Sequence, residues 1–168
     1  MPNYYLRLKR MVKTKYLKRF AMAPPVKPIP AETMYLSKNK VDDETVDDIA
    51  EYTMEWCVEK FGMNEQRGHP YLCWEWNTLD GEHDKDCLAY FDADDNTIII
   101  RARGHRTVKN FIKTIIHEYI HYLQPAKGGW YERWEEQYGY EKNPYEIEAY
   151  YLSDLYAQTA TNFVMDKL

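Results

Sequence analysis

The sequence contains little glycine, few cysteines and no long apolar run, and each shortage excludes a class of protein. Seven glycines among 168 residues, with no low-complexity tract, favour a chain that is mostly folded. No apolar stretch is long enough for a membrane-spanning helix. Cys57, Cys73 and Cys87 are widely spaced and form no CxxC pair, which favours reduced thiols in a reducing compartment over a disulfide framework.

The N-terminus lacks the apolar central stretch of a secretory signal peptide, so an intracellular and cytoplasmic location is expected. A mitochondrial presequence stays open, because the first twenty residues are basic and free of acids, although they are poor in serine.

Charge is divided unequally along the chain. Residues 1–40 contain ten Lys or Arg and one acid, Glu32, whereas residues 41–168 contain twelve Lys or Arg and twenty-six Asp or Glu. A basic segment followed by an acidic body suggests an interaction segment attached to a folded domain. We therefore expect a basic arm with a proline-rich linker over residues 1–30 and one domain over residues 31–168.

The arm itself has two parts. Residues 4–20 alternate apolar and basic groups at a spacing that suits a helix with one apolar face. A stiff spacer follows, with prolines at Pro24, Pro25, Pro28 and Pro30. The arm could bind nucleic acid, an anionic membrane or an acidic partner, or fold back on the acidic body as a pro-segment. A flexible, solvated tail is an equally good interpretation.

The remaining pattern predicts an α+β domain, with a small antiparallel or mixed sheet packed on two or three helices. Strands are expected at 71–76, 88–91 and 97–102, the last two as a hairpin, and helices at 42–61, 107–124 and 143–166. Residues 126–142 are expected to form a loop that could include a short helix. No internal repeat is present.

The helix that begins at Thr107 and ends before Pro125 contains an HExxH motif, His117-Glu118-Tyr119-Ile120-His121. Residues four apart lie one above the other on a helix, so both imidazoles can reach one metal ion. Glu118 would lie beside the metal, where it can take a proton from an activated water. His117 and His121 lie almost opposite the apolar stripe of their own helix, which is not typical of core histidines, so a solvated polar face is the alternative. That stripe contains Val108, Phe111, Ile112, Ile115, Ile116, Tyr119, Ile120 and Leu123.

A catalytic zinc site needs a third protein ligand, and the acidic segment after the motif offers two. No histidine follows the motif: the others are His69, His83 and His105. Asn143 suits a helix N-cap, which would place Glu146 in a capping box with it. Glu148 would share the apolar face of that helix, where a carboxylate needs a cation. That face holds Tyr151, Leu152 and Leu155. We therefore prefer Glu148 over Glu146 as third ligand.

HEYIHYLQ followed by NPYEIEAY resembles the small gluzincin-type zinc metallopeptidases, including compact forms encoded by phages and viruses. The resemblance covers roughly residues 97–155 and implies a minimal zincin-like fold. It implies one Zn²⁺ per chain held by His117, His121 and Glu148, with Glu118 as general base. Many gluzincins have an aspartate four residues after the third ligand that orients a metal-binding histidine. Leu152 stands there in this sequence, so the residues that orient the imidazoles stay unassigned.

The expected activity is that of a metalloendopeptidase, in which Glu118 takes a proton from water and passes it to the leaving amine. Tyr138, Tyr140 and His105 are candidates for stabilising the oxyanion, by chain position alone. The strand at 97–102 could border the cleft and accept an extended peptide as an added strand, or could simply be core. The alternative function is a zinc-stabilised binding module without hydrolysis, and the presence of Glu118 argues against it.

Overall fold

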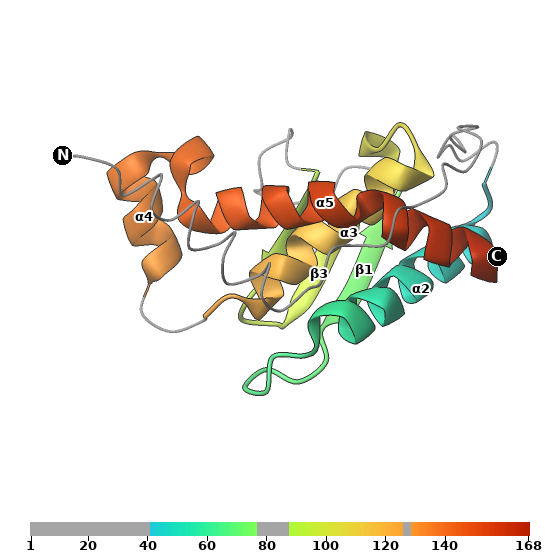
Figure 1. Ribbon diagram of the computed structural model, residues 1–168, viewed down its shortest axis with the longest axis horizontal. Coiled ribbons are helices and arrows are strands. Elements are labelled where there is room, and N and C mark those ends of the chain that lie inside the picture. The colour runs from blue at the N-terminus through green and yellow to red at the C-terminus, as the bar shows by residue number, and fades with distance from the viewer. Residues whose placement is uncertain (1–40, 77–87, 126–128) are drawn as a thin grey trace.

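A computed structural model describes residues 41–76, 88–125 and 129–168 of the chain, and these form four α-helices and one three-stranded mixed sheet (Figure 1). In chain order the elements are α2 (Asp43–Phe61), β1 (Tyr71–Glu75), β2 (Ala89–Asp92), β3 (Thr97–Arg101), the 3₁₀ turn η1 (Ala102–Gly104), α3 (Val108–Leu123), α4 (Trp130–Tyr138), the 3₁₀ turn η2 (Tyr140–Lys142) and α5 (Pro144–Lys167). The expected α+β class is confirmed. The arm at 1–30 and its expected helix at 4–20 lie outside the described residues.

The three long helices begin where the sequence predicts helix caps. The side chains of Asp42, Thr107 and Asn143 each accept a backbone N–H from the first turn of α2, α3 and α5. Pro144 follows as the first residue of α5, where its missing N–H costs no hydrogen bond. Gly62 ends α2 with φ 78°, a backbone conformation that glycine adopts without a steric penalty.

The sheet has the order β1-β3-β2, so β3 lies in the centre. It runs parallel to β1, with Tyr71 opposite Thr97, and antiparallel to β2, with Ala89 opposite Ile100. The expected hairpin of the second and third strands is thereby confirmed. Ile98 and Ile100 of β3 are fully buried. Apolar residues in a strand paired on both sides are typical of a sheet centre.

Helix α3 is the central element of the fold. It packs against β2 and β3, against α2, and along α5, which crosses it in Figure 1. Most of its apolar residues are buried, and the fully buried ones include Phe111, Ile112, Ile115, Ile116 and Tyr119. The HExxH motif therefore lies on a helix that is held by packing on several sides. None of the helices in the described residues is long and apolar enough to cross a membrane.

The segment expected to be a loop at 126–142 contains a nine-residue helix, α4, and the turn η2. Helix α4 has no buried residue and lies near the beginning of α5 (Figure 1). Gly129 precedes it and Gly139 follows it, both with positive φ. The helix brings an additional side chain, that of Tyr131, to the functional site.

Candidate metal centre

Two imidazoles from neighbouring turns of α3 face each other across a short gap. The Nε2 atoms of His117 and His121 lie 3.1 Å apart. His117 is 9% exposed and the adjacent Glu118 is 6% exposed. A solvated polar face would leave these side chains in water, so the burial favours a functional site over that alternative.

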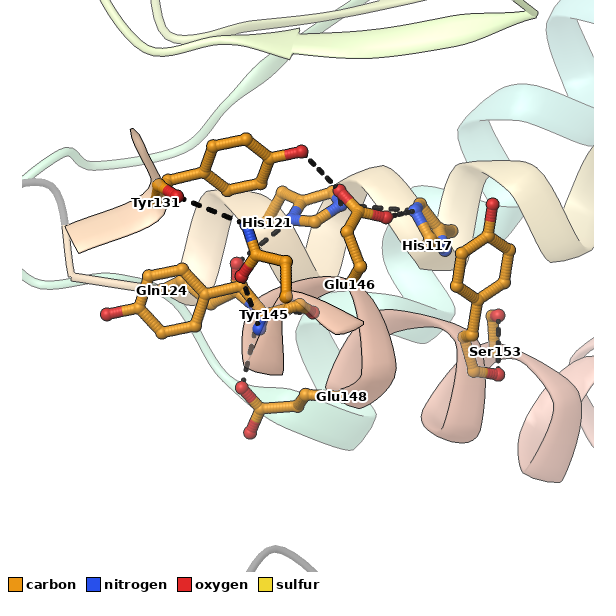
Figure 2. A network of polar contacts seen from close by, with 10 residues as sticks. His117, His121, Gln124, Tyr131, Tyr145, Glu146, Glu148 and Ser153 are labelled. Carbon is orange, nitrogen blue, oxygen red and sulfur yellow. Dashed lines mark hydrogen bonds and ion pairs between the residues drawn. The ribbon is translucent and has the colours of Figure 1, made fainter. Parts of the chain in front are cut away.

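The third member of the cluster is Glu146, from the first turn of α5 (Figure 2). Its Oε1 lies 3.3 Å from Nε2 of His121, and its Oε2 lies 3.4 Å from Nε2 of His117. This buried group of two imidazoles and one carboxylate could hold a metal ion. Tyr131 of α4 donates its hydroxyl hydrogen to Oε1 of Glu146 at 2.7 Å and completes the surroundings of that oxygen.

The structure brings Glu146, and not the preferred Glu148, to the two imidazoles, and the expected capping box does not form. The backbone N–H of Asn143 donates instead to the carbonyl of Tyr140 in η2. The carboxylate of Glu146 therefore has no capping role and points across to α3. Glu148 lies two residues further round the helix and points away from both imidazoles (Figure 2). Its Oε2 accepts from Nε2 of Gln124 at 3.3 Å.

The spacing of the three side chains suits a tetrahedral metal ion. Bonds of about 2.0–2.1 Å in a tetrahedral zinc site place neighbouring ligand atoms roughly 3.3 Å apart. The two Nε2 atoms lie 3.1 Å apart, and each of them lies 3.3 or 3.4 Å from a different oxygen of Glu146, so each contact is close to that spacing. With one ligand atom from each residue, the three atoms all lie within 4.8 Å of one another. In addition, Oε2 of Glu146 is buried and has no hydrogen-bond partner among the described residues. A buried carboxylate oxygen without a partner is costly, and a cation would satisfy it.

Burial and neighbouring charges shift two pKa values in the cluster, and both net shifts favour the charged form of the side chain. Burial alone would raise the pKa of Glu146, but its contacts with the two imidazoles and the hydrogen bond from Tyr131 lower it well below the ordinary range. Burial alone would lower the pKa of His121, yet the carboxylates of Glu146 and Glu118 raise it. The site therefore stabilises positive charge at His121, whether that charge comes from a proton or a metal ion.

Glu118 lies beside the cluster without joining it. Burial raises the pKa of its carboxyl group above the ordinary value, while the neighbouring imidazoles and the backbone N–H of Phe91 act in the opposite direction. A carboxylate with a raised pKa next to a metal ion is suited to accept a proton from water near neutral pH. The location agrees with the role expected for this residue in an HExxH motif.

Two adjoining cavities meet at the motif. The larger, of about 530 Å³, lies between β2, α3 and α4 and includes Arg67, Phe91, Trp130 and Tyr131 in its wall. The other, of about 460 Å³, continues on the far side, along α3 and α5. Both are lined by Ala89, His117, Glu118 and Tyr140. A ligand could therefore extend to either side of the cluster.

Of the three residues suggested for oxyanion stabilisation, Tyr140 is the one that lines both cavities. Its pKa is raised by burial, by its hydrogen bond with Tyr150 and by the charge of Glu146, so the hydroxyl stays protonated. Tyr138 stacks on Trp134 and lines neither cavity.

His105 lines the second cavity but has a structural role. Its Nδ1 is 2.8 Å from the carbonyl oxygen of Arg101, and its Nε2 is 2.8 Å from the hydroxyl of Thr114. Burial lowers its pKa, so the ring is neutral and both nitrogens are engaged.

The strand expected to accept a peptide is also corrected. Strand β3 is paired on both sides, by β1 and β2, and has no edge for another strand. Strand β2 is the edge strand on the cleft side, with Ala89, Tyr90 and Phe91 in the wall of the larger cavity. The cleft is therefore bordered by β2 and not by β3, the strand that the sequence suggested.

Comparison with known protein families, with curated proteins and with solved structures finds no match to this chain. The class of protein that the fold and the site define is an α+β protein with a buried His₂Glu cluster that could hold a metal ion. Its activity is inferred from the chemistry of that cluster and of the cleft around it.

Proposed function

We propose that this protein is a zinc-dependent metallopeptidase with a minimal zincin-like fold. The observation that carries the proposal is the convergence of His117, His121 and Glu146 within one ligand sphere, with Glu118 beside it. Two imidazoles, one carboxylate and an open fourth position form the ligand set of catalytic zinc sites. A purely structural zinc site is typically closed by four protein ligands and needs no adjacent carboxylate.

The residues around the cluster supply the groups that peptide hydrolysis needs. When bound, Zn²⁺ would polarise the scissile carbonyl and make water more acidic. Glu118 would accept a proton from the attacking water and deliver it to the leaving amine. Tyr140, whose hydroxyl is kept protonated, would donate a hydrogen bond to the oxygen of the tetrahedral intermediate.

The shape of the cleft favours a peptide over a small compact substrate. Strand β2 lies at the outside of the described sheet and borders the site, so an extended peptide would lie along this strand. The carboxylate of Glu118 accepts a hydrogen bond from the backbone N–H of Phe91, so strand β2 and the proposed general base are in direct contact. Cavities on both sides of the motif leave room for chain on each side of the cut bond, as an endopeptidase requires.

The test is hydrolysis of an unfolded protein substrate by the purified full chain. Activity should disappear with a zinc chelator and return with added zinc. Glu118→Gln should retain zinc and lose about 100- to 10,000-fold in turnover, because the amide cannot accept the proton. Glu136→Gln is the matched control, on the exposed part of α4 and outside both cavities, and should behave as wild type. Zinc binding without hydrolysis of any unfolded substrate would instead support a zinc-stabilised binding module.

A further inference from the structure

Gln124 connects the metal centre to the residue that the sequence had suggested as its ligand. This side chain lies at the C-cap of α3 and is 7% exposed. Its Oε1 is 2.9 Å from Nδ1 of His121. Its Nε2 donates to the carbonyl of Tyr145 at 3.0 Å and to Oε2 of Glu148 at 3.3 Å, both in α5 (Figure 2).

The two acceptors in α5 determine which way the amide of Gln124 faces. A carbonyl oxygen and a carboxylate oxygen can only accept hydrogen bonds, so both require the NH₂ group of the amide. The oxygen of the amide must then face His121. Since that oxygen cannot donate, Nδ1 of His121 must carry the hydrogen between them.

The hydrogen on Nδ1 fixes the chemistry of the other ring nitrogen. In the neutral imidazole only one nitrogen carries hydrogen, so Nε2 presents a lone pair. That atom is the one that lies 3.1 Å from Nε2 of His117 and 3.3 Å from Glu146. The hydrogen bond between Nδ1 of His121 and Gln124 therefore leaves Nε2 of His121 with a lone pair that can bind a cation.

We propose that Gln124 and Glu148 are positioning residues that act in series: Glu148 orients the amide of Gln124, and Gln124 fixes the tautomer and ring orientation of His121. This inference rests on the proposed metal site and assigns the support for an imidazole ligand that the sequence left open. It also accounts for the second acid in the Asn143–Ala149 segment, in which Glu146 faces the metal centre and Glu148 supports it from behind.

The burial of Glu148 supports this assignment. The residue is 8% exposed, and its carboxylate accepts the hydrogen bond from Gln124. A carboxylate is a stronger hydrogen-bond acceptor than a neutral oxygen, so Glu148 holds the NH₂ group of Gln124 in place. The same hydrogen bond polarises the amide and makes Oε1 of Gln124 a stronger acceptor for His121. Outer hydrogen bonds of this kind fix the orientation of histidine ligands and make them more basic toward the metal.

The first test is zinc affinity, measured by competition with a chelator on the full chain. Gln124→Met and Glu148→Met keep side-chain length and remove the hydrogen bonds, and each should weaken zinc binding by about 10- to 100-fold. Gln158→Met is the matched control, because Gln158 is half-buried and hydrogen-bonds Lys109 and Asn162 away from the cluster. Unchanged affinity in Gln124→Met, with its fold intact by circular dichroism, would overturn the proposal.

The double variant tests whether the two residues act in series. If Glu148 works only through Gln124, removing both should weaken zinc binding no more than Gln124→Met alone. Multiplicative losses would show that Glu148 acts independently and would contradict the proposed series.

The tautomer of His121 is a readout that requires neither metal nor activity. In metal-free protein at a pH where the ring is neutral, the ¹⁵N spectrum should show hydrogen on Nδ1 and none on Nε2. In Gln124→Met the preference should weaken. Hydrogen on Nε2 in the wild type would overturn this inference, whereas failure of the wild type to bind zinc would overturn the proposed function and leave this readout intact.

Discussion

The hydroxyl of Tyr131 donates to Oε1 of Glu146 at 2.7 Å, so the exposed helix α4 is tied directly to the metal centre. The hydrogen bond occupies the oxygen that faces His121, while Oε2 of Glu146 faces His117 and has no hydrogen-bond partner among the described residues. In this arrangement α3 supplies two ligands, α5 supplies the third, and α4 holds the third in place.

Tyr131→Phe should therefore weaken zinc binding by about 10-fold, because it removes a hydrogen bond that orients a ligand. Tyr138→Phe is the matched control on the same helix, since Tyr138 stacks on Trp134 and lines neither cavity. Chelator competition on both variants gives the comparison. Equal affinities in the two variants would mean that Tyr131 does not support the site.

Glu146→Gln should reduce zinc affinity by more than the roughly 10- to 100-fold lost with an outer partner of a ligand. The substitution keeps the shape of the side chain and removes the charge that faces both imidazoles. Glu148→Gln should lose far less, because its amide oxygen can still accept from Gln124. If zinc titration shows the larger loss in Glu148→Gln, the ligand set is His117, His121 and Glu148 after all.

Tyr140→Phe should lower turnover by about 100- to 1,000-fold, the loss typical of removing one oxyanion donor. Zinc affinity should fall no more than in Tyr131→Phe, because Tyr140 also has a hydrogen bond with Glu146 but is not itself part of the ligand group. Steady-state kinetics on an unfolded substrate, with zinc content measured in parallel, separates the two effects. Wild-type turnover in this variant would remove Tyr140 from the mechanism.

Metal-free protein should become less stable as the pH rises above 6.5 and through the raised pKa of His121. His121 has a pKa raised above its ordinary 6.5, so its stabilising contribution is complete below 6.5 and is lost as the pH rises through its folded value. Glu146, with a lowered pKa, contributes above its ordinary 4.5 and stays charged throughout this range. Zinc should reverse the trend, because metal binding requires the unprotonated imidazole.

Thermal denaturation with and without chelator measures both trends. In the Glu146→Gln variant the decline of the metal-free protein should be smaller, since the carboxylate that raises the pKa of His121 is gone. A metal-free wild type whose stability rises over the same range would contradict the assigned ionisation of the cluster.

The helices and the HExxH motif were predictable because their signals are local. Asp42, Thr107 and Asn143 cap the helices that their sequence context suggested, and Pro125 follows the end of α3. The α+β class follows from the same elements. The periodicity of α3 also placed both imidazoles on one face of the helix.

The choice between Glu146 and Glu148 could not be made from sequence, because it depends on a backbone hydrogen bond. The N–H of Asn143 is already bonded to Tyr140, and this turn frees Glu146 from capping. The sequence did contain a signal for the role of Gln124, because this residue lies three positions after His121 at the end of the same helix and can reach that ring. Tyr131 carried none, because its contact depends on how α4 folds back toward α5.

The order of the strands in the sheet could not be predicted from the local sequence pattern either. Periodicity gives the faces of a strand and not its neighbours, so β3 was a reasonable candidate for the cleft edge. The run Ile98-Ile99-Ile100, apolar on both faces, is nevertheless typical of a central strand and argued against that choice.

The metal content of the purified chain tests the central claim most directly. After mild dialysis and reconstitution, elemental analysis should find about one zinc per chain, as a single three-ligand site requires. The paired substitution of His117 and His121 by asparagine should remove it while the helical circular dichroism signal remains. A wild-type protein that holds no transition metal and takes up no added zinc would contradict the account, as would a variant lacking both imidazoles that binds zinc as the wild type does.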